Sequence, residues 1–329
     1  MQFRSTFVAL VPLGALWLLQ NFVGERFGIT ALWLYLPQHL WALWPLGFVA
    51  FGLCKRHREP LLAGLMALLF WSHFLLGFRF LGSLGNGNRT PNSVRLMSYN
   101  IARGAGGIDA LERAIRAQNP DIVCLQESQG AYGNHVYSPG ARIAARFPGW
   151  SMAQSGDVMT ISRFPIISKR ESVLRGTRRI LETTLATPRG AVRIINLHVA
   201  TSFKGQSFPP VGRLERITHV AANAKPSAQA RLGQIAPIQK AIAAGSRQTP
   251  LLVVGDFNSP PRGLFFNAIS RNLSDTWQSG GRGTGSTFPS NFPLLPIDHV
   301  LARGVSIERA FVPAVHASDH RPMIVDWHL

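Results

Sequence analysis

Three long apolar segments fill the first quarter of the chain, and shorter apolar runs recur through the remainder. The long segments span residues 7–24, 31–54 and 60–81, and the one formally charged side chain inside them, Arg79, lies close to an end. Each segment has about the 20 residues that a helix needs to cross the hydrocarbon core of a bilayer. This pattern predicts three transmembrane helices that form a membrane anchor over residues 1–81.

A signal peptide and a buried helical core are both less favoured than membrane spans. The first segment follows Arg4, as in a cleaved signal peptide, but residues 20–25 do not offer the small residues of a cleavage site. Successive helices that are apolar on all sides could also be buried in a soluble protein, provided that a large protein layer covers them. The rest of the chain does not offer such a layer.

The orientation in the membrane follows from the charges in the short loops. Residues 55–58, Lys-Arg-His-Arg, are the densest basic cluster near the predicted spans, whereas Glu25 and Arg26 in the other loop cancel. Basic loops stay in the cytoplasm, so three spans place the chain beyond about residue 85 outside it. Three arginines after the third span oppose this orientation: Arg79, Arg89 and Arg95. We therefore expect a multi-pass protein of the inner or plasma membrane with an extracytoplasmic domain.

The rest of the chain has the pattern of an α/β domain. Residues 82–93 are rich in Gly and Asn and predict a flexible linker. Beyond it, short apolar runs alternate with stretches of helical spacing. The predicted strands cover residues 94–99, 122–127, 158–165, 166–175, 179–187, 191–199, 251–254, 297–301 and 323–327. The predicted helices cover residues 108–118, 141–147 and 227–244. Residues 201–226 contain Gly, Pro and basic residues and predict a long loop beside the site.

Polar residues collect at the ends of these strands. Leu251 to Val254 predicts a strand buried on both faces, and Asp256 and Asn258 follow at its C-terminal end. The motif Gly-Asp-x-Asn alone is equally typical of a turn whose side chains bond to their own backbone. Other clusters favour a site, since they follow or interrupt apolar runs in the same way: Tyr99-Asn100, Gln126-Glu127, Asn196-Leu197-His198, Ile297-Asp298-His299 and Ser318-Asp319-His320.

Asn100 and Glu127 end two predicted strands that a helix joins. Strand, helix and strand in this order bring the two strand ends together. An amide oxygen and a carboxylate suit a hard divalent cation such as Mg²⁺, which takes few protein ligands and keeps several waters. A surface glutamate would not need to end so apolar a strand, so the sequence predicts a metal site here.

The five clusters, in this order, resemble the endonuclease/exonuclease/phosphatase superfamily, the DNase-I-like group of nucleases and phosphatases. The resemblance covers about residues 92–329 and implies a four-layer αββα sandwich with a site at one end. The sequence looks most like a bacterial branch with membrane spans and an exported catalytic domain. It departs from the abasic-site nucleases, because His198 stands where those enzymes have a tyrosine, and it lacks evident inositol-phosphatase signatures.

The resemblance also implies a role for each candidate residue. Glu127 and Asn100 hold Mg²⁺ or Mn²⁺, and Asp319 assists through a water or at a second site. Asp256 orients or deprotonates the attacking water, with Asn258 beside it. The remaining three residues act on the phosphate: His320 contacts it, Asp298 fixes the tautomer and charge of His320, and His198 supplies a further donor.

Charge and cysteine content bound the function further. Residues 90–329 carry 27 of the 34 Lys and Arg and 14 of the 16 Asp and Glu, a net charge of +13. Such a field favours phosphates, anionic lipid headgroups or nucleic acid as partners. The two cysteines do not offer a disulfide framework or a cysteine metal site, because Cys54 lies at a predicted membrane boundary and Cys124 in a predicted buried strand.

Three functions follow from these observations. The preferred one is a membrane-tethered phosphoesterase that acts on a phosphorylated lipid or a cell-envelope intermediate, since a tether raises the effective concentration of a substrate in the bilayer. The alternative is an extracytoplasmic metal-dependent nuclease, which the basic charge supports. A binding protein without catalysis is disfavoured by the complete set of acid, amide and histidine positions. The sequence leaves open the substrate and the number of metal ions.

Overall fold

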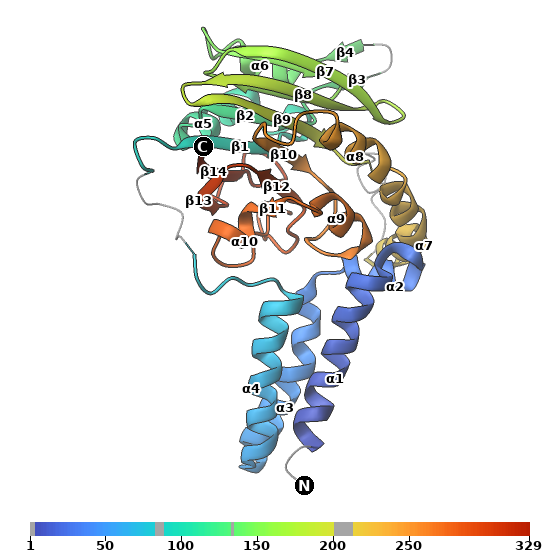
Figure 1. Cartoon of the computed structure of the whole chain (residues 1–329). Coiled ribbons are helices and arrows are strands. Elements are labelled where there is room, and N and C mark those ends of the chain that lie inside the picture. The colour runs from blue at the N-terminus through green and yellow to red at the C-terminus, as the bar shows by residue number, and fades with distance from the viewer. Residues whose placement is uncertain (1–3, 83–88, 133–134, 201–212) are drawn as a thin grey trace.

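The computed structural model describes residues 4–82, 89–132, 135–200 and 213–329. It consists of a slender helical bundle and a larger domain built on two sheets, which lies at one end of the bundle (Figure 1). The first described helix, α1 (Arg4–Leu18), begins at the end of the bundle far from this domain.

Two six-stranded sheets form the centre of the larger domain. The first has the order β13-β14-β1-β2-β6-β5 and the second β11-β12-β10-β9-β8-β7. The strands of the first sheet are β1 (Val94–Asn100), β2 (Ile122–Gln126), β5 (Ser151–Ser155), β6 (Val158–Ser162), β13 (Ser306–Phe311) and β14 (Met323–His328). Those of the second are β7 (Ile166–Arg175), β8 (Arg178–Thr187), β9 (Gly190–His198), β10 (Leu251–Asp256), β11 (Ser274–Asp275) and β12 (Asp298–Arg303). Strands β1 and β2 are parallel, as are β9 and β10, and the other neighbours are antiparallel.

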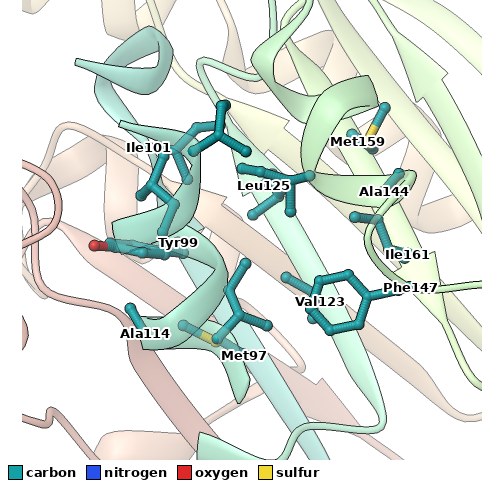
Figure 2. Packing of buried hydrophobic residues seen from close by; sticks show 14 of the residues in the cluster. Met97, Tyr99, Ile101, Ala114, Val123, Leu125, Ala144, Phe147, Met159 and Ile161 are labelled. Atoms are coloured by element: carbon teal, nitrogen blue, oxygen red, sulfur yellow. The ribbon is translucent and has the colours of Figure 1, made fainter. Parts of the chain in front are cut away.

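Helices cover the outer faces of the sheets and make this the four-layer arrangement that the resemblance implies. The helices of the domain are α5 (Ile108–Gln118), α6 (Pro139–Ala144), α7 (Arg213–Leu232), α8 (Ile235–Ala243), α9 (Gly263–Ser270) and α10 (Thr276–Gly280). Helices α5 and α6 pack on the first sheet (Figure 2), and α8 and α9 pack on the second. A third cluster of buried apolar residues lies between the sheets. A short hairpin of β3 (Gly130–Tyr132) and β4 (His135–Tyr137) follows β2.

The period of each element decides which face it buries. Along α5 the buried residues Ile108, Leu111 and Ile115 recur at helical spacing and face the first sheet. Along β1 the side chains alternate, so that Tyr99 packs under the helices while Leu96 packs between the sheets. The same alternation carries the polar residues at the strand ends toward the space between the sheets.

The bundle differs from the prediction in its second segment. Its long helices are α1 (Arg4–Leu18), α3 (Leu43–Lys55) and α4 (Arg58–Phe70). Single turns extend them: η1 (Leu19–Val23) and η2 (Gly24–Arg26) follow α1, η3 (Gln38–Ala42) precedes α3, and η4 (Trp71–Leu75) follows α4. The predicted span 31–54 is not one helix, because α2 (Gly28–Tyr35) is separate and the chain is extended at Leu36 before Pro37. Proline disfavours helical backbone in the preceding residue.

The described residues contain one helical stretch, Arg4–Arg26, that is long and apolar enough on its own to cross a membrane. Helix α2 does not run along the bundle but lies beside α7 and the larger domain (Figure 1). The prediction of three spans therefore stays a prediction, and the bundle helices that correspond to it are α1, α3 and α4.

The predicted linker 82–93 has more structure than expected. Residues 83–88 lie outside the described residues, but Arg89 forms an ion pair of 2.6 Å with Asp121 and Thr90 bonds to Glu308, which fixes this end to the domain. The flexible linker as a whole stays a prediction, with Arg89 and Thr90 held against the domain by these contacts.

The prediction of a loop over residues 201–226 is wrong from Arg213 onward. Residues 201–212 lie outside the described residues. Helix α7 begins at Arg213 and includes Pro226, although proline locally favours a loop. The predicted helix 227–244 is divided at Gly233 and Gln234 into α7 and α8.

Candidate active site

The polar residues of five strands meet at one edge of the sandwich. Asp256, the last residue of β10, pairs in register with His198 of β9 on one side and with Asp298 of β12 on the other. Asn100 ends β1 in the opposite sheet, and its amide Nδ2 donates to Asp256 Oδ2 at 3.0 Å. The two sheets therefore contact each other at this edge through polar groups, whereas apolar residues and one pair of buried amides fill the space behind.

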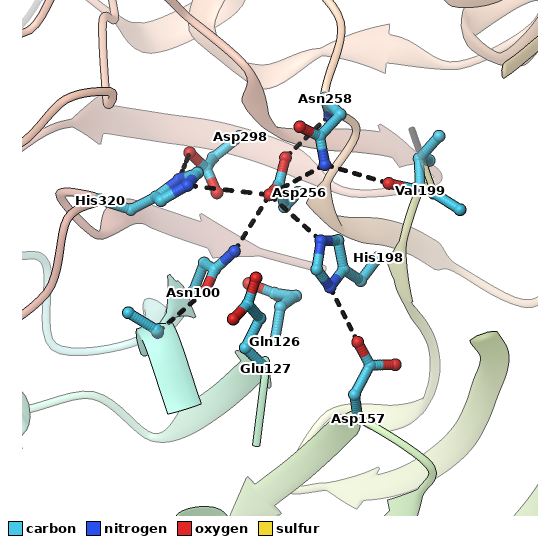
Figure 3. A network of polar contacts seen from close by, with 12 residues as sticks. Asn100, Gln126, Glu127, Asp157, His198, Val199, Asp256, Asn258, Asp298 and His320 are labelled. Atoms are coloured by element: carbon cyan, nitrogen blue, oxygen red, sulfur yellow. Dashed lines mark hydrogen bonds and ion pairs between the residues drawn. The ribbon is translucent and has the colours of Figure 1, made fainter. Parts of the chain in front are cut away.

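Asp256 is the centre of the arrangement and is buried (Figure 3). Its Oδ1 accepts the backbone N–H of Asn258 at 2.8 Å, and its Oδ2 also accepts Asn258 Nδ2 at 3.3 Å. The Nε2 atoms of His198 and His320 lie 3.5 and 3.9 Å from the same Oδ2. A carboxylate surrounded in this way is fixed in position.

His198 has a partner that the sequence analysis missed. Its Nδ1 donates to Asp157 Oδ2 at 2.9 Å, which leaves Nε2 directed toward Asp256. Arg178 forms an ion pair with the same carboxylate oxygen. Burial raises the pKa of Asp157, but the hydrogen bond from His198 and the charges of His198 and Arg178 outweigh it and hold the pKa below its ordinary value. The only sequence signal was Gly156-Asp157 in a turn directly before the apolar run 158–162.

His320 forms the second histidine–aspartate pair. Its Nδ1 lies 2.8 Å from Asp298 Oδ2, which also accepts the hydroxyl of Thr287 at 2.5 Å. Burial lowers the pKa of His320, but the charges of Asp298, Asp256 and Asp319 together raise it to about 10. His320 is therefore an imidazolium at neutral pH, with a proton on Nε2 that faces the centre of the site.

Asn100 and Glu127 fit a divalent cation by the chemistry of their donor atoms. Both offer oxygen, both are drawn below Asp256 in Figure 3, and Glu127 has a left-handed backbone with φ +52° directly after β2. The carboxylate of Glu127 is partly exposed and its present partner is Arg103 Nε at 3.4 Å. A second group, Asp256, Asp298 and His320, also has its ligand atoms within 4.8 Å of one another. Its imidazolium is already paired with Asp298, so the oxygen pair suits a hard ion better.

Two residues of the predicted clusters lie at the margin of the site. Asp319 is exposed, and its neighbour Ser318 donates to the backbone oxygen of Asn100 at 2.7 Å, which ties this loop to the end of β1. His299 points away from the site, because its Nε2 donates to the backbone oxygen of Ser259 and its ring packs on Phe257. The structure thus brings the predicted residues together, while their roles remain predictions.

Behind the site, two buried amides join the sheets. Gln126 of β2 donates to Asn196 Oδ1 of β9 at 2.9 Å, and Asn196 donates in turn to the backbone oxygens of Leu125 and Met159. Both side chains are fully buried. They fix the register of one sheet against the other just below the polar edge.

Comparison with known proteins identifies the family. The sequence profile of the Endonuclease/Exonuclease/phosphatase family matches residues 97–320, which begin in β1 and end at His320. The chain belongs to this family. The residues that define the polar edge, from Asn100 to His320, all fall inside the matched range.

Solved structures of the family share the fold at low sequence identity. The mannosyl-6-phosphatase of Bacteroides thetaiotaomicron is 17% identical with a TM-score of 0.55, and the match covers 72% of this chain and 100% of that one. A humanized TDP2 from D. rerio is 14% identical with a TM-score of 0.54, and the match covers 72% of this chain and 99% of that one. An endonuclease/exonuclease/phosphatase from Beutenbergia cavernae is 18% identical with a TM-score of 0.51, with 72% of each chain covered.

A UPF0294 protein of Vibrio cholerae is more similar over a shorter stretch. It is 37% identical to this chain over 84 residues, which are 24% of this chain and 28% of the Vibrio protein. The match thus spans less than a third of either protein.

The pairing of His320 with Asp298 predicts a pH effect. The folded-state pKa lies above the ordinary 6.5, so protonation of His320 stabilises the fold fully below about pH 6.5, and this contribution is lost as the pH rises through about 10. In Asp298→Asn we expect the titration midpoint of His320, followed by NMR of the imidazole, to fall well below that of the wild type. The exposed-residue variant Asp109→Asn serves as control. An unchanged midpoint in Asp298→Asn would show that Asp298 does not hold the proton.

Proposed function

We propose that this member of the family is a membrane-tethered, divalent-metal-dependent phosphoesterase, which hydrolyses a phosphate ester of a lipid or cell-envelope intermediate with an activated water. The observation that carries the proposal is the position of Asp256, with histidine Nε2 atoms on two sides and the oxygen donors of Asn100 and Glu127 at the same edge. These are the groups that hydrolysis of a phosphate ester needs.

Each residue of the site has a separate role in the proposed hydrolysis. Asp256 accepts a proton from the attacking water and aims its oxygen at phosphorus, and Asn258 holds the carboxylate in place. His320 donates from Nε2 to a phosphoryl oxygen, on which negative charge grows in the transition state, and His198 does the same when both of its ring nitrogens carry a proton. A divalent cation held by Asn100 and Glu127 supplies charge neutralisation when it is bound.

The surface of the bundle supports the membrane tether. Large apolar side chains are exposed along the outer faces of α1, α3 and α4: Phe7, Val8, Val11, Leu18, Leu43, Leu46, Phe51, Leu53, Leu62, Leu65, Met66 and Leu69. Exposed apolar surface of this extent is unusual for a protein in water and is typical of one that contacts lipid. Residues 55–58 and the N-terminal end lie at the end of the bundle far from the domain, as an extracytoplasmic catalytic domain requires (Figure 1).

The alternative, an extracytoplasmic nuclease, is supported by one observation, the net charge of +13 over residues 90–329. A basic domain attracts the phosphates of DNA as readily as lipid headgroups. The tether favours the lipid, because it concentrates the site near the bilayer and offers little toward a soluble polymer.

Activity on any phosphoester should require a divalent metal. We expect turnover to be lost in excess chelator and restored by Mg²⁺ or Mn²⁺. Glu127→Ala should raise the metal concentration for half-maximal activity at least about tenfold, since changes even to residues around metal ligands cost 10–100-fold. Glu112→Ala, a glutamate on the outer surface of α5, should leave it unchanged. Full turnover in the presence of chelator would refute the metal-dependent mechanism.

The orientation in the membrane can be tested by inserting a reporter at two positions of the full-length chain. A reporter that is active only outside the cytoplasm should give a signal when it is joined after residue 82, and none when it is joined at His57. The opposite pattern would place the domain in the cytoplasm and remove the basis for an envelope substrate.

The substrate class can be tested with the full-length protein in vesicles. We expect hydrolysis of a lipid phosphoester in the same bilayer and little cleavage of duplex DNA. Asp256→Asn should lower the rate on the order of 10²–10³, the usual cost of one transition-state group. Strong DNA cleavage that falls steeply with salt, without lipid hydrolysis, would establish the nuclease instead.

A further inference from the structure

The N-terminal region is joined to the loop that follows the catalytic strand β10. Glu25, in the turn η2 at the top of α1, is buried, and its carboxylate binds two groups. Its Oε2 accepts the backbone N–H of Leu264, in the first turn of α9, at 2.8 Å, and its Oε1 accepts the hydroxyl of Tyr35 at 3.0 Å. A carboxylate at the N-terminus of a helix is favourable, and here it comes from a segment more than 200 residues away.

The N-terminal region packs directly against the backbone at the start of α9. Gly263 has φ +89°, and a Cβ there would lie 2.6 Å from Leu34 Cδ2 and 2.9 Å from Glu25 Oε1. Only glycine fits this position. Next to it, Arg262 is buried and its Nη1 donates to Gln20 Oε1 at 3.1 Å, which adds a second buried contact with the N-terminal region.

Tyr35 extends the connection toward the site. Its hydroxyl lies 3.4 Å from Ser259 Oγ, and its ring is covered by the guanidinium of Arg231 from α7, 3.9 Å from the ring centroid. Ser259 directly follows Asn258, whose backbone N–H and amide hold Asp256. Three consecutive contacts thus lead from the anchor to the central carboxylate.

We propose that Glu25 and Tyr35 are positioning residues of the active site, which hold the loop 257–264 in the shape that places Asn258 and Asp256. The expected loss of turnover rests on the proposed function, whereas the expected change in the mobility of the loop does not.

The backbone of the loop explains why it needs this support. Asn258 has φ +48°, a left-handed conformation that non-glycine residues adopt at a cost and that the surroundings must maintain. The catalytic domain holds this loop through the backbone oxygens of Val199 and Ile297, which accept from Asn258 Nδ2 and from the N–H of Phe257. The ring of His299 adds a third contact, because its Nε2 donates to the backbone oxygen of Ser259. On the far side of the turn, the Ser259 hydroxyl, the Arg262 guanidinium and the Leu264 N–H each have a partner in the N-terminal region.

The test uses the full-length protein in detergent or vesicles, with bis(4-nitrophenyl) phosphate as a soluble substrate that needs no membrane. Tyr35→Phe removes the hydroxyl without leaving a large void, so we expect kcat to fall about tenfold, with KM changed less than twofold and the same melting temperature. Glu25→Gln should lower kcat similarly, and the double variant should lose little more, because the two residues act as one unit. The matched controls are Tyr137→Phe on the exposed hairpin and Glu59→Gln at the opposite end of the bundle.

Hydrogen exchange of the loop gives a readout that is independent of activity. In Tyr35→Phe and Glu25→Gln we expect faster amide exchange over residues 257–264, including Leu264, while exchange in β2 and β6 stays as in the wild type. Unchanged exchange together with kcat within twofold of the wild type would overturn the proposal and leave the contact as one that only attaches the two parts. If the wild type hydrolyses no phosphoester, the proposed function fails, and the exchange measurement still decides whether the anchor shapes the loop.

Discussion

The structure depends on keeping one carboxylate, that of Asp256, buried between two sheets. A charged group in such a place is tolerated only when donors surround it. Asn100 donates to it from the opposite sheet and Asn258 from the following loop, and the Nε2 atoms of His198 and His320 lie 3.5 and 3.9 Å away. The register of both sheets must therefore be correct at this point. The amide pair behind it, which joins β2 to β9, serves the same requirement by preventing the sheets from sliding.

Sequence periodicity is sufficient for most of the fold, because the elements that decide it are short and strongly patterned. The helix at 108–118 and the strands at 166–175 and 191–199 lie at or within a residue of their predicted limits. The candidate residues meet at one edge because alternation along a strand fixes the face of every second side chain. Asn100 and Asp256 could be expected to face each other once their strands were assigned to facing sheets.

The features that the sequence does not reveal depend on contacts between distant segments. Nothing near Asp157 marks it as the partner of His198, because the two residues meet only when β6 and β9 lie in facing sheets. Strands β5 and β13 escape prediction since their polar residues dilute the alternation. The start of helix α7 escapes it because Pro226 indicates a loop locally, and α2 resembles part of a span because its composition is as apolar as that of a span.

The contact of Glu25 with the first turn of α9 gives the molecule a fixed geometry relative to its bundle. If the bundle is seated in a bilayer as proposed, a freely jointed domain could sample any height above the surface, whereas a domain attached through η2 and α2 would keep Asp256 at one height. The distance between the bilayer surface and a substrate phosphate would then matter as much as the chemistry of the phosphate. A phosphate that projects too little or too far from the lipid surface would pass the site at the wrong level, and selection among substrates would follow the length of the headgroup.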